Sequence, residues 1–158
     1  MDDIRAFISN YQPSDEVRIK FDWNGKHAED FRDGNQEFRG KVRKAVIDDV
    51  SAAPVILVRD LFRAETKWAV QAWGVVEGVD VLAEGLLRRG GTAYLDDFLE
   101  GKYSCFDANL GSAFPWDRQL LTTMLNEVRV RLAADPTSPK AGLWRQGERL
   151  FVGEMPCV

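Results

Sequence analysis

The sequence predicts a mainly α-helical fold: a compact multi-helix domain with one short N-terminal strand or hairpin and a candidate short strand near the C-terminus. Apolar residues recur every three or four positions over most of the chain, which is the spacing of an amphipathic helix. Only two short segments show a β pattern. The 158 residues are 45% hydrophobic and 11% aromatic, enough to fill one core, so we treat residues 1–158 as a single globular domain.

The N-terminal third is predicted as a helix, a strand and a second helix. Residues 1–11 carry apolar side chains at helical spacing and predict a short amphipathic helix. Residues 17–23 alternate apolar and charged side chains, which predicts a strand, and the Asn24-Gly25 pair that follows is a strong hairpin-turn signal. From residue 36 to residue 50 the spacing is helical again.

The remainder of the chain is predicted as helices separated by proline and glycine. Their expected bounds are, in chain order, 54–74, 79–89, 92–100, 115–135 and 138–147. Residues 102–113 are the least periodic stretch and are predicted as a loop or short extended segment. Leu150-Phe151-Val152 is the second β candidate and supplies the predicted C-terminal strand.

Composition and charge favour a cytoplasmic protein without a nucleic-acid or membrane partner. The chain has 21 basic and 25 acidic side chains, a net charge of −4 and no strongly basic stripe, which argues against nucleic-acid binding. Its longest apolar run, residues 52–58, is far too short to cross a bilayer. The two cysteines, Cys105 and Cys157, are distant in sequence and Cys157 is next to last, so we expect reduced thiols rather than a disulfide.

The residue inventory offers few routes to catalysis. His27 is the only histidine and follows a predicted turn, where an exposed loop side chain is the simplest interpretation. No cysteine or histidine pair has the short spacing of a zinc site, and we expect neither a metal nor a cofactor. The basic run Arg39–Lys44 contains no aromatic residue and has acidic neighbours, so we interpret it as a solvated helix face rather than a nucleic-acid site.

Aromatic and acidic side chains are the most useful positive feature. Trp68 and Trp73 fall on or near the apolar stripe of a helix and are expected in the core, whereas tryptophans that follow helix-start prolines are expected to be partly exposed. Residues 94–107 mix aromatic and acidic residues with a single lysine. The candidate binding residues are Asp96, Asp97, Glu100, Tyr103, Trp116 and Trp144.

These observations favour a non-enzymatic protein-binding domain of the inhibitor, immunity or adaptor type. Its predicted contact surface is acidic and aromatic, which suits a basic protein partner. The alternative is a carboxylate-based enzyme or a small-ligand or metal-binding domain, in which Asp96 and Glu100, at positions i and i+4, share a helix face. The sequence does not decide whether the protein is an enzyme, although it favours a binding role.

Overall fold

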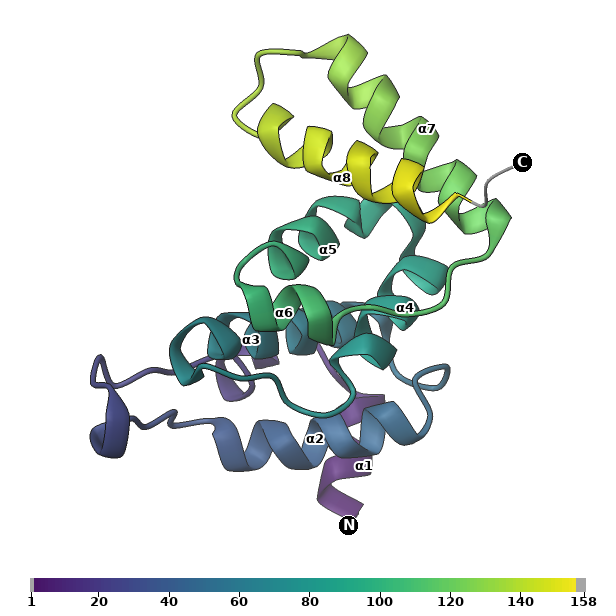
Figure 1. The fold of residues 1–158 in the computed structure, drawn as a ribbon. Helices are drawn as coiled ribbons and strands as arrows, with labels where there is room; N and C mark the ends of the chain where they lie inside the picture. Colours follow the sequence, from purple (N-terminus) through teal and green to yellow (C-terminus); the bar gives the residue numbers. More distant parts are fainter. Residues whose placement is uncertain (1, 156–158) are drawn as a thin grey trace.

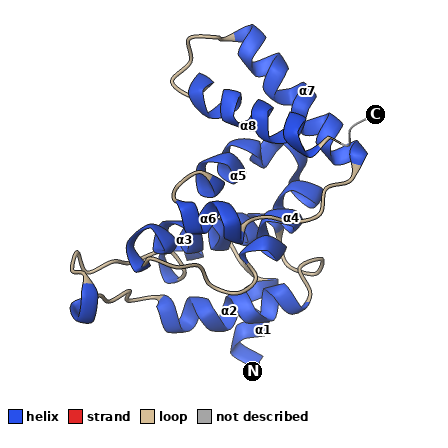
Figure 2. Ribbon diagram, viewed as in Figure 1, coloured by secondary structure: helices blue, strands red, loops and turns tan. Residues whose placement is uncertain are grey.

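The computed structural model describes residues 2–155, and the chain in this range is mainly helical (Figures 1 and 2). The α-helices are α1 (Asp2–Ser9), α2 (Gln36–Asp48), α3 (Val55–Ala72), α4 (Val79–Gly90), α5 (Leu95–Lys102), α6 (Phe106–Gly111), α7 (Arg118–Ala134) and α8 (Ala141–Glu154). Three 3₁₀ helices, Pro13–Arg18, Ala28–Asp30 and Gly91–Tyr94, connect some of them. The prediction of a mainly α fold is confirmed.

The helices are arranged around α5, which lies between two groups of helices. α7 and α8 form an antiparallel hairpin at one end of the molecule, and α8 packs on α5 (Figure 1). On its other side α5 contacts α3, which is paired with α4. α1 and α2 pack together at the opposite end of the molecule (Figure 1). A side chain on α5 can therefore contact either group of helices.

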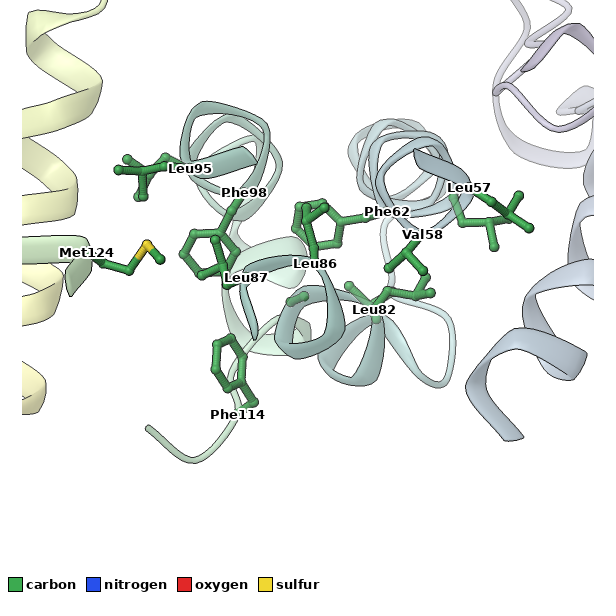
Figure 3. Packing of buried hydrophobic residues seen from close by; sticks show 14 of the residues in the cluster. Leu57, Val58, Phe62, Leu82, Leu86, Leu87, Leu95, Phe98, Phe114 and Met124 are labelled. Carbon is green, nitrogen blue, oxygen red and sulfur yellow. The ribbon is translucent and has the colours of Figure 1, made fainter. Parts of the chain in front are cut away.

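One apolar core joins the two groups. Phe62 of α3 stacks on Phe98 of α5 with ring centroids 6.2 Å apart. Phe98 in turn meets Trp116 edge to face at 5.9 Å, and Trp116 meets Phe151 of α8 at 5.5 Å. Figure 3 shows part of this core, in which leucines of α4 lie beside Phe62 of α3 and Phe98 of α5. Burial of one such side chain stabilises the fold by about 1.5–3 kcal/mol, so this aromatic row holds the hairpin onto the rest of the domain.

The predicted N-terminal strand is wrong. Residues 13–18 form a 3₁₀ helix, and the segment beyond it makes one isolated antiparallel bridge between Trp23 and Asp33. The expected two-residue hairpin turn at Asn24-Gly25 does not form either. Gly25 has a φ of 77°, but Asn24 N–H donates to the Arg32 carbonyl at 3.0 Å and so closes a longer loop. A ladder does not extend from it because the returning segment, residues 26–34, is polar and offers no apolar face to pair with.

The predicted C-terminal strand and the predicted loop at 102–113 are also wrong. Leu150-Phe151-Val152 lies inside α8, where Phe151 joins Trp144 and Gly147 on one buried helix face. Their spacing of three and four residues continues the helix beyond the expected end at residue 147. Within 102–113, α6 forms over six residues, and the Cys105 sulfur accepts a hydrogen bond from the Ala108 N–H to cap it.

Two further properties of the described chain bear on the sequence predictions. Among residues 2–155, no helix combines the length and the apolar character that a membrane span requires. Cys105 is a free thiol, whereas Cys157 lies outside the described residues.

Candidate functional site

Asp96 is the centre of a polar network that ties α5 to the α7–α8 hairpin. Its Oδ1 accepts hydrogen bonds from Arg131 Nη1 of α7 and from Trp144 Nε1 of α8, both at 2.8 Å. Its Oδ2 accepts from Lys140 Nζ at 2.9 Å. Arg131 also donates to the Thr92 carbonyl at 2.8 Å. These hydrogen bonds occupy both carboxylate oxygens within the fold, so Asp96 holds the α7–α8 hairpin against α5.

The electrostatics of Asp96 support this interpretation. Burial alone would raise the pKa of its carboxyl group, but hydrogen bonds from Lys140 and Trp144, together with the positive charges of Lys140 and Arg131, lower that pKa below its ordinary value. A lowered pKa means that the ionised carboxylate is more favourable in the folded protein than in the unfolded chain. The network therefore stabilises the fold while Asp96 is charged.

Asp97 and Glu100 lie on the same helix and meet other basic side chains. The pKa of Asp97 is raised, because burial outweighs the favourable charges of Arg63 and Arg59. Asp97 Oδ1 lies 3.7 Å from Arg63 Nε of α3. Glu100 is 53% exposed and lies 3.2 Å from Lys140 Nζ. Every carboxylate of the predicted acidic surface thus has a cationic neighbour, which leaves little uncompensated negative charge on α5.

The aromatic residues of the predicted site contribute to packing. Tyr103 Oη donates to the Gln146 carbonyl of α8 at 3.3 Å. Trp116 is half-buried in the aromatic row described above. Trp144 is only 8% exposed, so the expectation that it is partly exposed is wrong. The physical reason is that α8 turns this indole toward α5, where Asp96 accepts its N–H.

A different surface carries the exposed aromatic groups. Eight large hydrophobic side chains are exposed among the described residues, and five of them belong to the end of α3, the segment after it, and α6. We call these five residues the apolar strip: Val70, Trp73, Val75, Phe106 and Leu110. Trp73 is 87% exposed and Phe106 is 75% exposed. The expectation that Trp73 lies in the core is therefore wrong.

Two contacts place α6 beside the end of α3 and the segment after it. At one end of α6, Ser104 Oγ donates to the Thr66 carbonyl of α3 at 3.4 Å. At the other end, the Gly111 backbone lies so close to Val75 that a Cβ atom there would come within 2.5 Å of Val75 Cγ2. α6 consequently runs alongside the second half of α3 and the segment beyond it (Figure 1). Phe106 and Leu110, one helical turn apart, share the outer face of α6.

Trp73 has a backbone conformation that a tryptophan rarely adopts. It ends α3 with φ 56° and ψ 51°, the left-handed region that favours glycine. For a residue with a Cβ atom this conformation costs about 1–2 kcal/mol. Gly74 follows directly and would take the same position at lower cost if α3 were one residue longer. The chain instead holds an indole in this position and directs it into solvent.

The charged side chains near the strip are mainly acidic. Glu77 and Asp80 follow Val75 and are exposed, and Asp107 is adjacent to Phe106 and half-buried. Lys67, one turn before Val70, is the exposed basic residue of this part of α3. The local balance is therefore negative, in contrast to the compensated face of α5.

The sequence contained a signal for the strip that periodicity reasoning missed. Trp68 and Trp73 are five positions apart, which places them about 140° apart around a helix, too far for one narrow stripe. The apolar residues of 102–113 were assigned to a loop, although Phe106 and Leu110 have the i, i+4 spacing of a helix. A search for apolar residues outside the helical stripes would have found both.

The described residues include no group of three or more histidine, cysteine, aspartate or glutamate side chains arranged to hold a metal ion. His27 is exposed and packs against Trp23 with ring centroids 4.9 Å apart.

Comparisons with protein-family models, curated proteins and solved structures find no match to this chain.

Proposed function

We propose that this protein is a non-enzymatic binding domain that docks on another protein through the apolar strip. The observation that carries the proposal is Trp73, which is almost fully exposed on a strained, left-handed backbone. Exposed tryptophan is among the residues that contribute most at protein interfaces. Backbone strain of this kind persists mainly at functional sites, where the gain in binding offsets its cost to stability.

The strip suits a partner with a concave apolar pocket and a basic rim. Trp73 and Phe106 project from the surface, and aromatic side chains of this size bury about 150–250 Å² each when they are enclosed. Because a standard interface covers about 800 Å² per partner, these residues would anchor a larger contact whose edge is polar. Glu77 and Asp107 supply negative charge at that edge, which favours a basic partner. A second copy of this chain would present the same projecting side chains and the same negative charge, so we favour a different protein.

An inhibitor, immunity-type or adaptor protein works by docking of this kind, and the strip is a more suitable contact surface than the predicted acidic face. Asp97 and Glu100 remain candidates for a second contact, because they are less enclosed by hydrogen bonds than Asp96. Reversing the charge of both residues tests them separately from the strip. If partner affinity is unchanged by that double reversal, the face of α5 takes no part in binding.

The experiment is affinity capture from the native source with four matched baits. The baits are the wild type, Trp73→Gly, Phe106→Ser and Val130→Ser, in which Val130 is an exposed valine of α7 far from the strip in sequence. We expect the wild type and Val130→Ser to capture the same protein, and the two strip variants to lose it. Equal capture by all four baits would refute the proposal. Sedimentation at increasing concentration provides the second test, because self-association that disappears in Trp73→Gly would identify a second copy as the occupant and reject a different partner.

A further inference from the structure

A buried cluster of charged side chains joins α2, α3 and the segment before α2. Asp33 Oδ2 accepts from Arg39 Nη2 at 2.6 Å, and Glu65 Oε1 accepts from Arg43 Nη1 at 2.8 Å. Arg39 Nε lies 3.1 Å from the same Glu65 oxygen. Asp33, Arg39 and Glu65 have side chains that are at most 1% exposed, and only Arg43 reaches the surface, at 18%.

Arg39 keeps its charge inside this cluster. Burial would lower the pKa of Arg39, but hydrogen bonds to Asp33 and Glu65 and their negative charges outweigh burial and raise that pKa. Arg39 is therefore a guanidinium ion inside the fold. Buried ions are tolerated when the remaining donors and acceptors of the group are also satisfied.

In this cluster the remaining donors and acceptors are not all satisfied. Within the described residues, four buried side-chain atoms have no hydrogen-bond partner: Glu65 Oε2, Trp68 Nε1, Arg43 Nε and Arg39 Nε. Arg39 Nε lies against Glu65 Oε1 as an ion pair, so the other three are the atoms left without a partner. More than nine buried polar groups in ten have a partner in native proteins, and each one left without costs about 1–3 kcal/mol. Glu65 and Trp68 are three residues apart on α3, so their side chains point in similar directions. Apart from Arg39 Nε, one acceptor and two donors on neighbouring residues of α2 and α3 are thus unused.

The residues that carry these atoms line an open cavity at the surface between α2 and α3. The cavity has a volume of about 370 Å³ and is lined by both helices and by Val76. Glu65, Trp68 and Arg43 all line it, and so does Gly40, where a Cβ atom would meet nothing within 4 Å. A volume of this size is at the lower end of the range for small-molecule sites.

We propose that this cavity binds a small neutral molecule with an imide or amide edge, in which an N–H group lies beside carbonyl oxygens. The N–H would donate to Glu65 Oε2, and the carbonyl oxygens would accept from Trp68 Nε1 and Arg43 Nε, so all three unused groups gain a partner. A cation does not suit the cavity, because Arg39, Lys41, Arg43 and Lys44 outnumber Glu37 and Glu65 among its lining residues. A small anion such as phosphate would lie against the Glu65 carboxylate and would fill only part of the volume.

Contact between a ligand in this cavity and the three unused atoms requires movement of Arg43. The three atoms are almost fully covered, and Arg43 is the most exposed member of the cluster. A shift of its side chain toward solvent uncovers them at the lowest cost, because a guanidinium group is readily hydrated there. Glu65 retains Arg39 as a cationic neighbour when Arg43 moves.

The experiment is a titration followed by the NMR signal of the Trp68 indole N–H, which the variant Trp68→Phe identifies. The probes are succinimide and 1-methyluracil, each with a single imide N–H, and the controls are N-methylsuccinimide and 1,3-dimethyluracil, which lack that donor. We expect at least one probe to shift the Trp68 signal saturably, and the N-methylated controls to leave it unchanged. The proposal is overturned if neither probe gives a saturable shift at concentrations up to about 10 mM, because binding weaker than that is too weak for a specific site. It is also overturned if the N-methylated controls bind as well as the probes.

Two substitutions at Gly40 separate ligand binding from folding. Gly40→Leu fills the open space with a side chain and should weaken probe binding by roughly tenfold or more. Gly40→Ala adds only a methyl group and should preserve binding. Both variants keep every charged group of the cluster, so each is expected to fold. Full probe affinity in a folded Gly40→Leu protein would place the probe outside this cavity and reject the proposal.

Discussion

Replacing Asp96 with alanine tests whether this residue holds the α7–α8 hairpin onto α5. The variant removes the acceptor of the Trp144 indole N–H, which is 2.8 Å from Asp96 Oδ1. It also removes the partner of Arg131 on α5 and one of the two α5 carboxylates that pair with Lys140, which keeps Glu100. Because the carboxylate is only 22% exposed, water replaces these interactions incompletely. We expect a lower free energy of unfolding with no change in the helical content of the remaining fold.

The magnitude follows from the separate interactions. Leaving the buried Trp144 N–H without an acceptor costs about 1–3 kcal/mol. The Lys140 pair is largely exposed and contributes about 0–1 kcal/mol. Arg131 retains Glu127 and the Thr92 carbonyl as partners, so the loss of its ion pair with Asp96 costs a similar amount of free energy. The total is about 1–5 kcal/mol, which lowers the midpoint of thermal unfolding by about 2–20 °C in a chain of this length.

Chemical denaturation monitored by circular dichroism measures this change, and Glu100→Ala is the matched control. Glu100 lies on the same helix and pairs with the same lysine, but it is 53% exposed, so its loss should cost less than about 1 kcal/mol. A double-mutant cycle with Trp144→Phe isolates the indole contact. We expect Asp96→Ala to lower the free energy of unfolding by about 1–2 kcal/mol less in the Trp144→Phe background than in the wild type, because the indole N–H is already absent there.

Acid supplies an independent check with a defined sign. The pKa of Asp96 is lower in the folded protein than in the unfolded chain, so its stabilisation is fully present above the ordinary value of 3.8 and disappears as the pH falls through the folded value. The difference between wild type and Asp96→Ala should therefore be largest at neutral pH and shrink below pH 3.8. An Asp96→Ala cost no larger than that of Glu100→Ala, or one that does not change with pH, would refute the assignment of Asp96 as the hairpin anchor.

Four further substitutions test other parts of the fold by denaturation. Gly40→Ala should raise the free energy of unfolding by about 0.5–1 kcal/mol, since alanine favours the helix. Gly101→Ala should lower it by about 1–3 kcal/mol, because its Cβ atom would lie 2.5 Å from Phe62 Cε1. Equal effects of the two substitutions would contradict the packing described at Gly101. Trp73→Gly should leave stability unchanged or raise it by up to about 1 kcal/mol, since it relieves the left-handed backbone; a clear loss would show that the indole supports the fold. Tyr11→Phe should cost about 1–2 kcal/mol, because Tyr11 Oη donates to buried Asp60 at 2.8 Å, and an unchanged midpoint would argue against that bond.

Helix positions were predictable because each long helix buries one face. The stripe of Leu121, Met124, Leu125 and Val128 is buried in α7 as its spacing predicts. The strand prediction at residues 17–23 failed because alternation describes a strand only when a partner exists, and pairing is not encoded within the segment itself. The end of α8 was placed too early because Leu150-Phe151-Val152 is too short for its period to distinguish helix from strand.

Candidate binding residues were harder to predict than helices, since their role depends on contacts between distant segments. Asp96 and Trp144 are 48 positions apart, and only the fold shows that the carboxylate and the indole satisfy each other. The sequence predicts a buried Trp73 because this residue falls near the apolar stripe of the predicted helix, whereas α3 ends one residue before it. Composition identifies the residues capable of binding, and the fold decides which of them are already occupied.

The two proposed sites lie where the chain departs from the rules that govern the rest of it. A left-handed tryptophan costs about 1–2 kcal/mol and each unpartnered buried polar atom about 1–3 kcal/mol, against a total stability of about 5–15 kcal/mol for a typical protein. The fold gains no packing energy from the Trp73 side chain, since that side chain is exposed. The unused atoms of Glu65 and Trp68 likewise gain no internal bond. Costs of this size are offset when a partner or a ligand binds, which is why we place both functions on the second half of α3 and not on the well-satisfied carboxylates of α5.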